Sequence, residues 1–287
     1  MQHKFPVREL DAGEFPPLLH EIPEPPLQLF VRGELPKRDM KCLAVVGSRN
    51  YTNYGKESVE YLIAGLSGYD IAIVSGLALG IDALAHEAAL RASLYTLAVP
   101  GSGLHDSVLY PRKNLTLAHR ILSMGGGLIS EFDPFFYATK WSFPKRNRVM
   151  AGLSHATLII EAGERSGTLI TARLAVDYNR ELLVVPGSIF GENSKGPHQF
   201  LKLGATPITT PEDILEALHI EKIETPRNET STMNENEAHV LACLASPTDR
   251  DSLIRALDLD TQEANILLTH MELAGLIRES NGIFYKT

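Results

Sequence analysis

Residues 42–76 read CLAVVGSRNYTNYGKESVEYLIAGLSGYDIAIVSG and contain one strand–helix–strand unit. CLAVVG and IAIVS are apolar throughout, as expected for parallel strands that are covered on both faces. The segment between them, YGKESVEYLIAGLS, has apolar residues at three- and four-residue spacing, which is typical of a helix packed on a sheet. The stretch therefore predicts a β–α–β unit.

The same alternation continues to about residue 220. Further strands are predicted from the apolar runs YTLAVP, GLIS, HATLIIE and ELLVVP, and helices from GIDALAHEAALRAS, LTLAHRILSMG and TLITARLAVDYN. Alternating strands and helices favour a parallel sheet with helices on both faces. We expect an α/β fold over residues 41–220, with a Rossmann-like, doubly wound and mostly parallel sheet.

Three other segments flank this domain. Residues 1–40 contain repeated prolines and predict an extended arm that packs on the domain. Residues 221–236 are polar and acidic, which is typical of a linker. Residues 237–287 predict three helices and a hairpin with Asn281-Gly282 at its turn, so we expect a small winged-helix-like domain.

Composition limits the class of protein. Cys42 and Cys243 lie far apart and in no metal-ligand spacing, which argues against disulfides and structural zinc. The N-terminus has no apolar leader and no segment approaches ~20 consecutive apolar residues, so a cytoplasmic protein without membrane contact is expected. A net charge of −8 disfavours nucleic acid, yet residues 41–220 carry 16 basic and 16 acidic residues, while residues 221–287 carry 6 and 12. A local basic cleft therefore remains possible in the middle domain.

Small residues follow almost every predicted strand, as in Gly47-Ser48, Ser75-Gly76 and Pro100-Gly101-Ser102-Gly103. Because strand carboxyl ends meet at one crevice in a doubly wound sheet, these turns predict an anion-binding edge, although any single glycine can serve only its own turn. Neither a GxGxxG sequence in register nor a Walker lysine is present, so dinucleotide and P-loop functions are disfavoured.

Cations and aromatic residues accompany this edge. Arg49 follows Gly47-Ser48, Lys113 follows a later strand, and residues 140–148 read KWSFPKRNR. Cations follow a phosphate backbone while aromatic rings stack on unpaired bases, so this mixture suits single-stranded nucleic acid. The alternative is structural: Trp141 and Phe143 as core anchors, the cations as a solvated rim, and Arg49 in a surface salt bridge.

The acidic residues Asp82, Glu131 and Glu161 lie near the same loops but accompany no nucleophile or metal spacing. His86 follows Asp82 by four residues and is expected to be a helix-surface or core histidine. We expect no catalytic residues, no metal and no cofactor.

The ordered motifs resemble the DprA/Smf DNA-processing family over about Cys42–Ala217. They are Gly47-Ser48-Arg49, SGLALGID (residues 75–82), PGSGLHDSVLYPRKN (100–114), FPKRNRVMAGLS (143–154), EAGERSGTLITARLA (161–175), and VPGS with KGPHQFLKLGA. The C-terminal module resembles the winged helix that many members carry. Members often have an N-terminal SAM-like domain, which the short arm cannot contain.

The resemblance implies an extended Rossmann-like fold. It also implies a homodimeric protein that binds single-stranded DNA, protects incoming DNA and helps load the RecA recombinase during natural transformation and recombination. Carried over by motif, the main DNA-contacting residues are Arg49, Lys140 and Phe143. The full candidate set is Ser48, Arg49, Gly76, Lys113, Lys140, Phe143, Arg146, Asn147 and Arg148.

Two other functions stay open. The related LOG-type phosphoribohydrolases carry a PGGxGTxxE motif, but Thr171 stands here where that glutamate belongs, which would leave a ribosyl cation poorly stabilised. A transcription regulator acting through the winged helix is the other alternative.

Overall fold

The computed structural model describes residues 5–164, 166–221, 235–244, 246–257, 259–273, 276–280 and 282–286. The chain divides into two compact units, Met1–Lys222 and Ile223–Thr287. Most of the expected linker, residues 221–236, falls outside the described residues.

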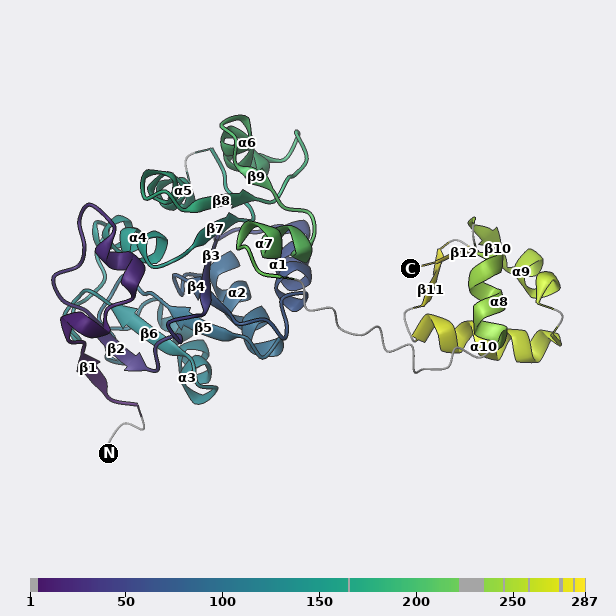
Figure 1. Cartoon of the computed structure of the whole chain (residues 1–287), viewed down its shortest axis with the longest axis horizontal. Coiled ribbons are helices and arrows are strands. Elements are labelled where there is room, and N and C mark those ends of the chain that lie inside the picture. The colour runs from purple at the N-terminus through teal and green to yellow at the C-terminus, as the bar shows by residue number, and fades with distance from the viewer. Residues whose placement is uncertain are drawn as a thin grey trace. The chain divides into compact units, whose positions relative to one another are not determined.

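The first unit contains a nine-stranded sheet (Figure 1) in the order β1-β2-β6-β5-β4-β3-β7-β8-β9. All pairs from β6 to β9 are parallel, and β1 and β2 join one edge in antiparallel fashion. The strands are β1 (Val7–Glu9), β2 (Phe30–Gly33), β3 (Lys41–Val46), β4 (Ile71–Ser75), β5 (Tyr95–Ala98), β6 (Gly127–Ser130), β7 (Ala156–Ile159), β8 (Glu181–Val184) and β9 (Thr206–Pro207). This confirms the doubly wound, mostly parallel sheet.

Helices cover both faces of the sheet. The helices are α1 (Asn53–Ala64), α2 (Ile81–Arg91), α3 (Leu115–Ser123), α4 (Ser142–Gly152), α5 (Thr168–Asp177), α6 (Lys195–Lys202) and α7 (Pro211–Ala217). Alternate residues of β3 divide between two cores: Leu43 and Val45 pack with α1, α2 and α7, whereas Ala44 and Val46 pack with α4, α5 and α6. This alternation explains why the strands are apolar throughout.

The N-terminal arm is part of this unit. Strand β2 pairs with β6, with Phe30 opposite Ser130 and Gly33 opposite Gly127. Leu19 and Ile22 of the arm are buried in the core that α4 also joins. The arm thus extends the sheet in addition to packing on it, which its proline content did not predict.

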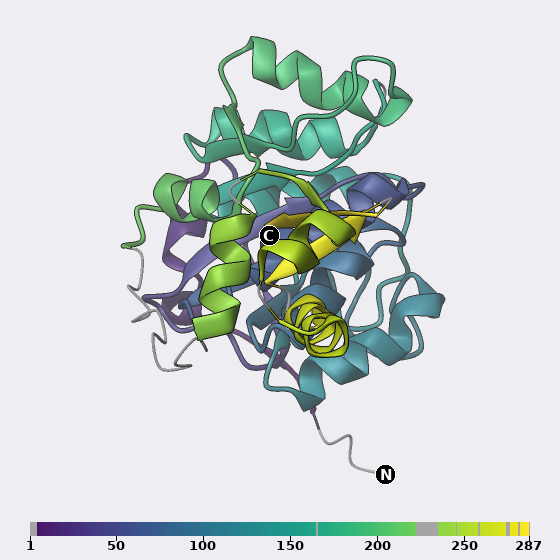
Figure 2. The ribbon, with the colours of Figure 1, turned by 90° about the vertical axis from the view of Figure 1, so that its right-hand side faces the viewer.

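The described residues of the second unit form three helices and a small sheet (Figure 2). The elements are α8 (Glu235–Cys243), β10 (Thr248–Asp249), α9 (Arg250–Ala256), α10 (Thr261–Leu273), β11 (Ile277–Ser280) and β12 (Ile283–Lys286). Strands β11 and β12 form the expected hairpin, and Gly282 at its turn has a φ of 79°, while Asn281 lies outside the described residues. Val240, Leu253, Leu268 and Phe284 form its core. Strand β10, which pairs with β12, was not anticipated.

Candidate nucleic-acid interface

A pocket of about 490 Å³ lies where the order of the sheet reverses. From β3, the chain proceeds to β4, β5 and β6 on one side, and then returns to β7 on the other side (Figure 1). Ligands of doubly wound sheets bind at this switch point, beyond the strand carboxyl ends. The pocket brings together five of the candidate residues, namely Ser48, Arg49, Phe143, Arg146 and Asn147.

A cationic and aromatic group lies at the pocket: Arg49 is exposed and Phe143 half-buried in its lining, and the exposed Tyr110 lies beside Phe143. The Arg49 guanidinium carbon lies 5.7 Å from the centroid of the Phe143 ring. The rings of Phe143 and Tyr110 lie 5.7 Å apart at 55°, and Phe143 packs so closely on Gly101 that a Cβ there would be 2.7 Å from the ring. Arg49 is exposed and forms no ion pair with any described residue. This group can hold a phosphate beside a stacked base.

The loop that carries Arg49 is fixed from the neighbouring strands. Glu161, after β7, accepts hydrogen bonds from the Thr52 amide at 2.9 Å and the Thr52 hydroxyl at 2.5 Å. Thr168 donates to the Gly47 carbonyl at 3.1 Å, and Asn193 donates to the Asn50 carbonyl at 2.8 Å. Glu161 is therefore committed to positioning the loop.

Arg146 has a different role from Arg49. Its guanidinium is buried and donates to the carbonyl of Gly76 at 2.6 Å and to the carbonyl of Val99. Asp82 accepts the Gly76 amide at 3.1 Å, so Gly76 is held from both sides. Burial lowers the pKa of Arg146 to about 10, an effect that the charge of Asp82 opposes. Arg146 thus forms part of the pocket wall, and Gly76, which does not line the pocket, holds it in place.

Arg148 lies apart from the pocket-lining residues. It contacts the carboxylate of Glu131 and donates to the Glu24 carbonyl at 2.6 Å. The Lys145 ammonium lies 3.5 Å from the same carboxylate of Glu131. Burial raises the pKa of Glu131, and the two cations oppose that shift.

Lys113 and Lys140 are exposed and form no ion pair with a described residue. Neither lines the pocket. Lys113 precedes Asn114, whose amide donates to the carbonyls of Leu77 at 2.8 Å and Ala78 at 3.1 Å, and Ala78 is a pocket residue. Lys145 and Arg148 pair with Glu131 and Arg146 is buried, so Lys140 is the exposed cation of residues 140–148 that forms no ion pair within the described chain.

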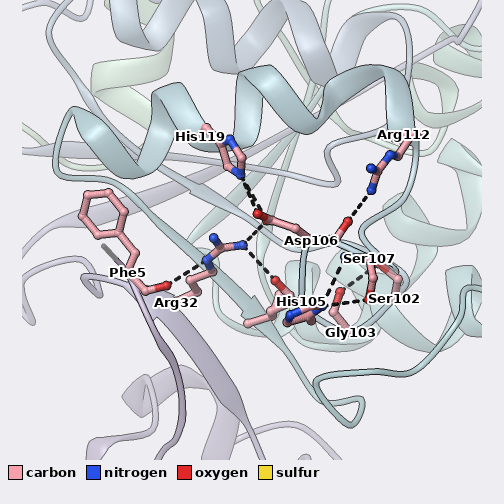
Figure 3. Close-up of polar contacts among 10 residues, drawn as sticks. Phe5, Arg32, Ser102, Gly103, His105, Asp106, Ser107, Arg112 and His119 are labelled. Atoms are coloured by element: carbon pink, nitrogen blue, oxygen red, sulfur yellow. Dashed lines mark hydrogen bonds and ion pairs between the residues drawn. The ribbon is translucent and has the colours of Figure 1, made fainter. Parts of the chain in front are cut away.

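A polar cluster fixes the loop 100–114, which carries Tyr110 and Lys113 (Figure 3). Arg32 from β2 is buried and donates to the Leu104 carbonyl at 3.1 Å and to the Asp106 carboxylate at 2.5 Å. His119 on α3 lies 3.0 Å from the same carboxylate. Burial alone would raise the pKa of Asp106, but the hydrogen bonds and charges of Arg32 and His119 lower it to about 2.

This cluster was missed from the sequence. A single arginine in a proline-rich arm carries no signal of a contact 74 residues away.

The other titratable groups show no metal-binding arrangement. His86 is buried, its Nδ1 lies 2.7 Å from the Thr96 hydroxyl, and burial lowers its pKa to about 3. Within the described residues, no group of three His, Cys, Asp or Glu side chains could hold a metal ion. No helix among them is long and apolar enough to cross a membrane.

Comparisons with known proteins show which family the chain resembles in sequence. The family model described as DNA recombination-mediator protein A matches residues 7–219, and the model of the DprA winged helix domain matches residues 224–282. Protein Smf of Escherichia coli is 42% identical over 208 residues, which is 72% of this chain and 55% of that protein. DNA processing protein DprA of Bacillus subtilis is 38% identical over 73% of this chain and 70% of its own length. The chain thus spans little more than half of the first of these relatives.

Two solved structures are similar to the first unit's fold. DNA processing protein A from Streptococcus pneumoniae superposes with a TM-score of 0.68 at 39% identity, covering 77% of this chain and 76% of that one. DNA processing protein A from Helicobacter pylori, described for its single-stranded DNA binding mode, gives a TM-score of 0.67 at 29% identity, covering 76% and 98%.

Proposed function

The chain belongs to the DNA recombination-mediator protein A family, whose relatives are named DprA or Smf, and we propose that it binds single-stranded DNA at the switch-point pocket. The observation that carries the proposal is the exposed, unpaired Arg49 against the ring of Phe143, with Tyr110 beside it. A phosphate binds the guanidinium while an unpaired base contacts the rings. The H. pylori relative is described as binding single-stranded DNA, which supports the same ligand class.

In this proposal, the candidate residues divide into two roles. Arg49, Phe143, Lys113 and Lys140 contact the strand, because they are wholly or partly exposed and their cations are unpaired. The other candidates act by position. Ser48, Arg146 and Asn147 line the pocket, and Gly76 holds Arg146 through its carbonyl. Arg148 ties α4 to Glu131, the residue that follows β6.

We further infer that the pocket binds without catalysing a reaction. Asp82 is the only carboxylate among its described lining residues, and it already accepts the amides of Gly76 and Ala78. A phosphoribohydrolase would need a carboxylate near Thr171, which is itself buried. Incubation with nucleoside monophosphates followed by detection of ribose 5-phosphate tests this, and release of that product would support the LOG-type alternative.

Oligonucleotide titration tests the main proposal. Single-stranded oligomers should bind more tightly than the matched duplex, because a duplex hides the base faces. Arg49→Ala and Lys140→Ala should each weaken binding and reduce the slope of log K against log salt by about 0.7, the value for one lost phosphate contact with a single strand.

Arg91→Ala is the matched control. Arg91 is similarly exposed but lies in the last turn of α2, whose first turn is the end that faces the pocket, and it pairs with Glu60 at 2.9 Å. Its binding and salt slope should stay at the wild-type values. Unchanged affinity and slope in both pocket variants of folded protein would refute the assignment.

The proposed physiological role is loading of RecA onto incoming single strands by a homodimer in the cytoplasm, during natural transformation and recombination. Light scattering measures the oligomeric state. The rate of RecA nucleation on strands covered by single-strand binding protein measures the loading. A monomer in solution would contradict the proposed homodimer. A nucleation rate that the protein does not change would contradict RecA loading.

A further inference from the structure

Between β6 and α4, the chain presents large aromatic side chains to solvent. Phe135 is 60% exposed, Tyr137 70% and Trp141 55%. Isolated exposed apolar residues are ordinary, but a group of aromatic rings within one short segment marks an interaction surface. We call residues 132–141 the aromatic segment.

Contacts beneath the surface hold the Trp141 ring in place. Phe132 and Phe136 stack with ring centroids 4.7 Å apart at 20°, and Trp141 meets them edge-on at 5.8 and 5.5 Å. The Lys145 ammonium lies 5.7 Å from the Phe132 ring and 5.8 Å from the Trp141 ring. Ring faces that are already positioned lose little entropy when a flat ligand stacks on them.

The aromatic segment is continuous with the pocket through the loop 100–114. The Gly103 amide donates to the Phe136 carbonyl at 2.9 Å, and the ring of His105 lies 4.5 Å from that of Phe135. In the same loop, Gly101 supports Phe143 and accepts the Ser142 hydroxyl at 2.6 Å. Trp141 and Phe143 are therefore separated by one anchored residue, and the unpaired Lys140 precedes them.

We propose that the aromatic segment is a second stacking surface, over which a single strand bound in the pocket continues. This proposal rests on the proposed function and extends the single-strand binding site from the pocket to a path across the aromatic segment. Cations beside aromatic faces match a ligand that alternates phosphates with unpaired bases better than they match an apolar protein segment. The one exposed carboxylate in the segment, Asp133, accepts the Phe135 amide at 2.8 Å and is occupied by that local turn.

Trp141 supplies the measurement, because it is the only tryptophan in the chain. Its fluorescence is followed while thymidine oligomers of about 5 and about 20 nucleotides are added to the full-length protein. We expect the longer oligomer to quench Trp141 more strongly. In the double variant Phe135→Ala with Tyr137→Ala, affinity for the longer oligomer should fall by roughly tenfold or more, and affinity for the shorter one should stay the same.

Controls separate the possible failures. Tyr61→Ala removes a ring that is 56% exposed on α1 and should change neither affinity, and melting curves confirm that the double variant is folded. If the wild type binds neither oligomer, the proposed function itself is wrong. If it binds both and the double variant binds the longer oligomer equally well, the path is wrong and the surface belongs to a protein partner.

Discussion

At the scale of single residues, Arg49 and Arg146 line the same pocket but differ in whether they can bind a ligand. Arg146 donates its hydrogen bonds to buried carbonyls of the strand ends, so its charge supports the pocket wall. Arg49 donates none to a described residue and lies over the half-buried Phe143 ring, so its hydrogen bonds remain available to a ligand. Exposure and free donors, more than residue type, determine which guanidinium can bind a phosphate.

Phe143 allows a sharp test of stacking. Phe143→Ala should cost on the order of 1 to 3 kcal/mol in affinity for a single strand and leave the salt slope nearly unchanged, because stacking releases few counterions. Titration at several salt concentrations gives both values. Phe143 also packs on Gly101, so the melting temperature must be measured in parallel. A loss of affinity that follows a loss of stability would make Phe143 a core residue.

The lowered pKa of the buried His86 leads to a prediction of how the free energy of unfolding depends on pH. Its pKa is about 3 in the folded protein, well below the ordinary value of 6.5, because burial opposes protonation. The unfolded chain therefore binds a proton at this site below about pH 6.5 and the folded chain does not, so the free energy of unfolding decreases from there toward pH 3. At pH 5 the decrease amounts to roughly 2 kcal/mol.

Urea titrations at pH 7 and pH 5, followed by Trp141 fluorescence, measure this effect in the first unit. The free energy of unfolding should differ less between pH 7 and pH 5 in His86→Gln than in the wild type, by about the same 2 kcal/mol. This holds whatever the variant's absolute stability. His20→Gln, at an exposed histidine, serves as the control. Equal pH dependence in wild type and His86→Gln would show that His86 is not the group responsible.

At the scale of elements, the apolar runs predicted every strand from β3 to β8, because strands covered on both faces leave a plain pattern. The site followed from them, since the loops after β3 and β7 must meet at the switch point. Helix α4 was not anticipated: its few apolar residues have weak periodicity, and Pro144 obscures it although the first turn of a helix tolerates proline. Strands β1 and β2 were missed because edge strands of three and four residues carry little pattern.

The sequence also could not show which cations of residues 140–148 are paired. The sequence identified them as a cluster, but the partners of Arg148, for example, are Glu131 after β6 and Glu24 in the N-terminal arm. Only the three-dimensional structure distinguishes the unpaired Lys140 from Arg148. Long-range pairing of this kind has no local signature.

The anchor between β2 and the loop 100–114 leads to a prediction for that element. Asp106→Asn removes the charge that Arg32 and His119 contact, and should lower the free energy of unfolding at pH 7 by roughly 1 to 3 kcal/mol. The wild-type interaction is complete above about pH 4 and is lost as the pH falls toward 2, because the folded pKa is depressed.

Hydrogen exchange provides the local measurement. Amides of residues 104–110 should exchange faster in Asp106→Asn, and single-strand affinity should decrease because Tyr110 is less well positioned. Glu60→Gln, which weakens the exposed pair with Arg91, should change stability by less than about 1 kcal/mol. Wild-type exchange rates in Asp106→Asn would show that the loop keeps its conformation without the contacts of the Asp106 carboxylate.

At the scale of the whole chain, the two units differ in charge. The middle of the first unit is balanced and exposes unpaired cations, whereas residues 221–287 carry twice as many acids as bases. In a helix-turn-helix that recognises DNA, the second helix enters the major groove with cations and amides. Here α10 contains Glu263 and Glu272 and no lysine or arginine. Asn265 already accepts hydrogen bonds from Arg250.

We therefore predict that the winged-helix unit serves protein contacts or regulation and contributes little to DNA affinity. Its acidic residues repel phosphates, and Arg278, which could contact DNA from the hairpin, lies over the ring of Tyr285. The first unit has its own cores, so deletion of residues 225–287 should leave it folded and keep single-strand affinity within about a factor of ten, or about 1.4 kcal/mol. The isolated unit, titrated with duplex DNA of varied sequence, is the complementary measurement. Sequence-specific duplex binding by the isolated unit, together with a larger loss of affinity on deletion, would favour a transcription regulator. Contacts to base edges in a matched major groove would then have to outweigh the repulsion between the acidic helix α10 and the phosphates.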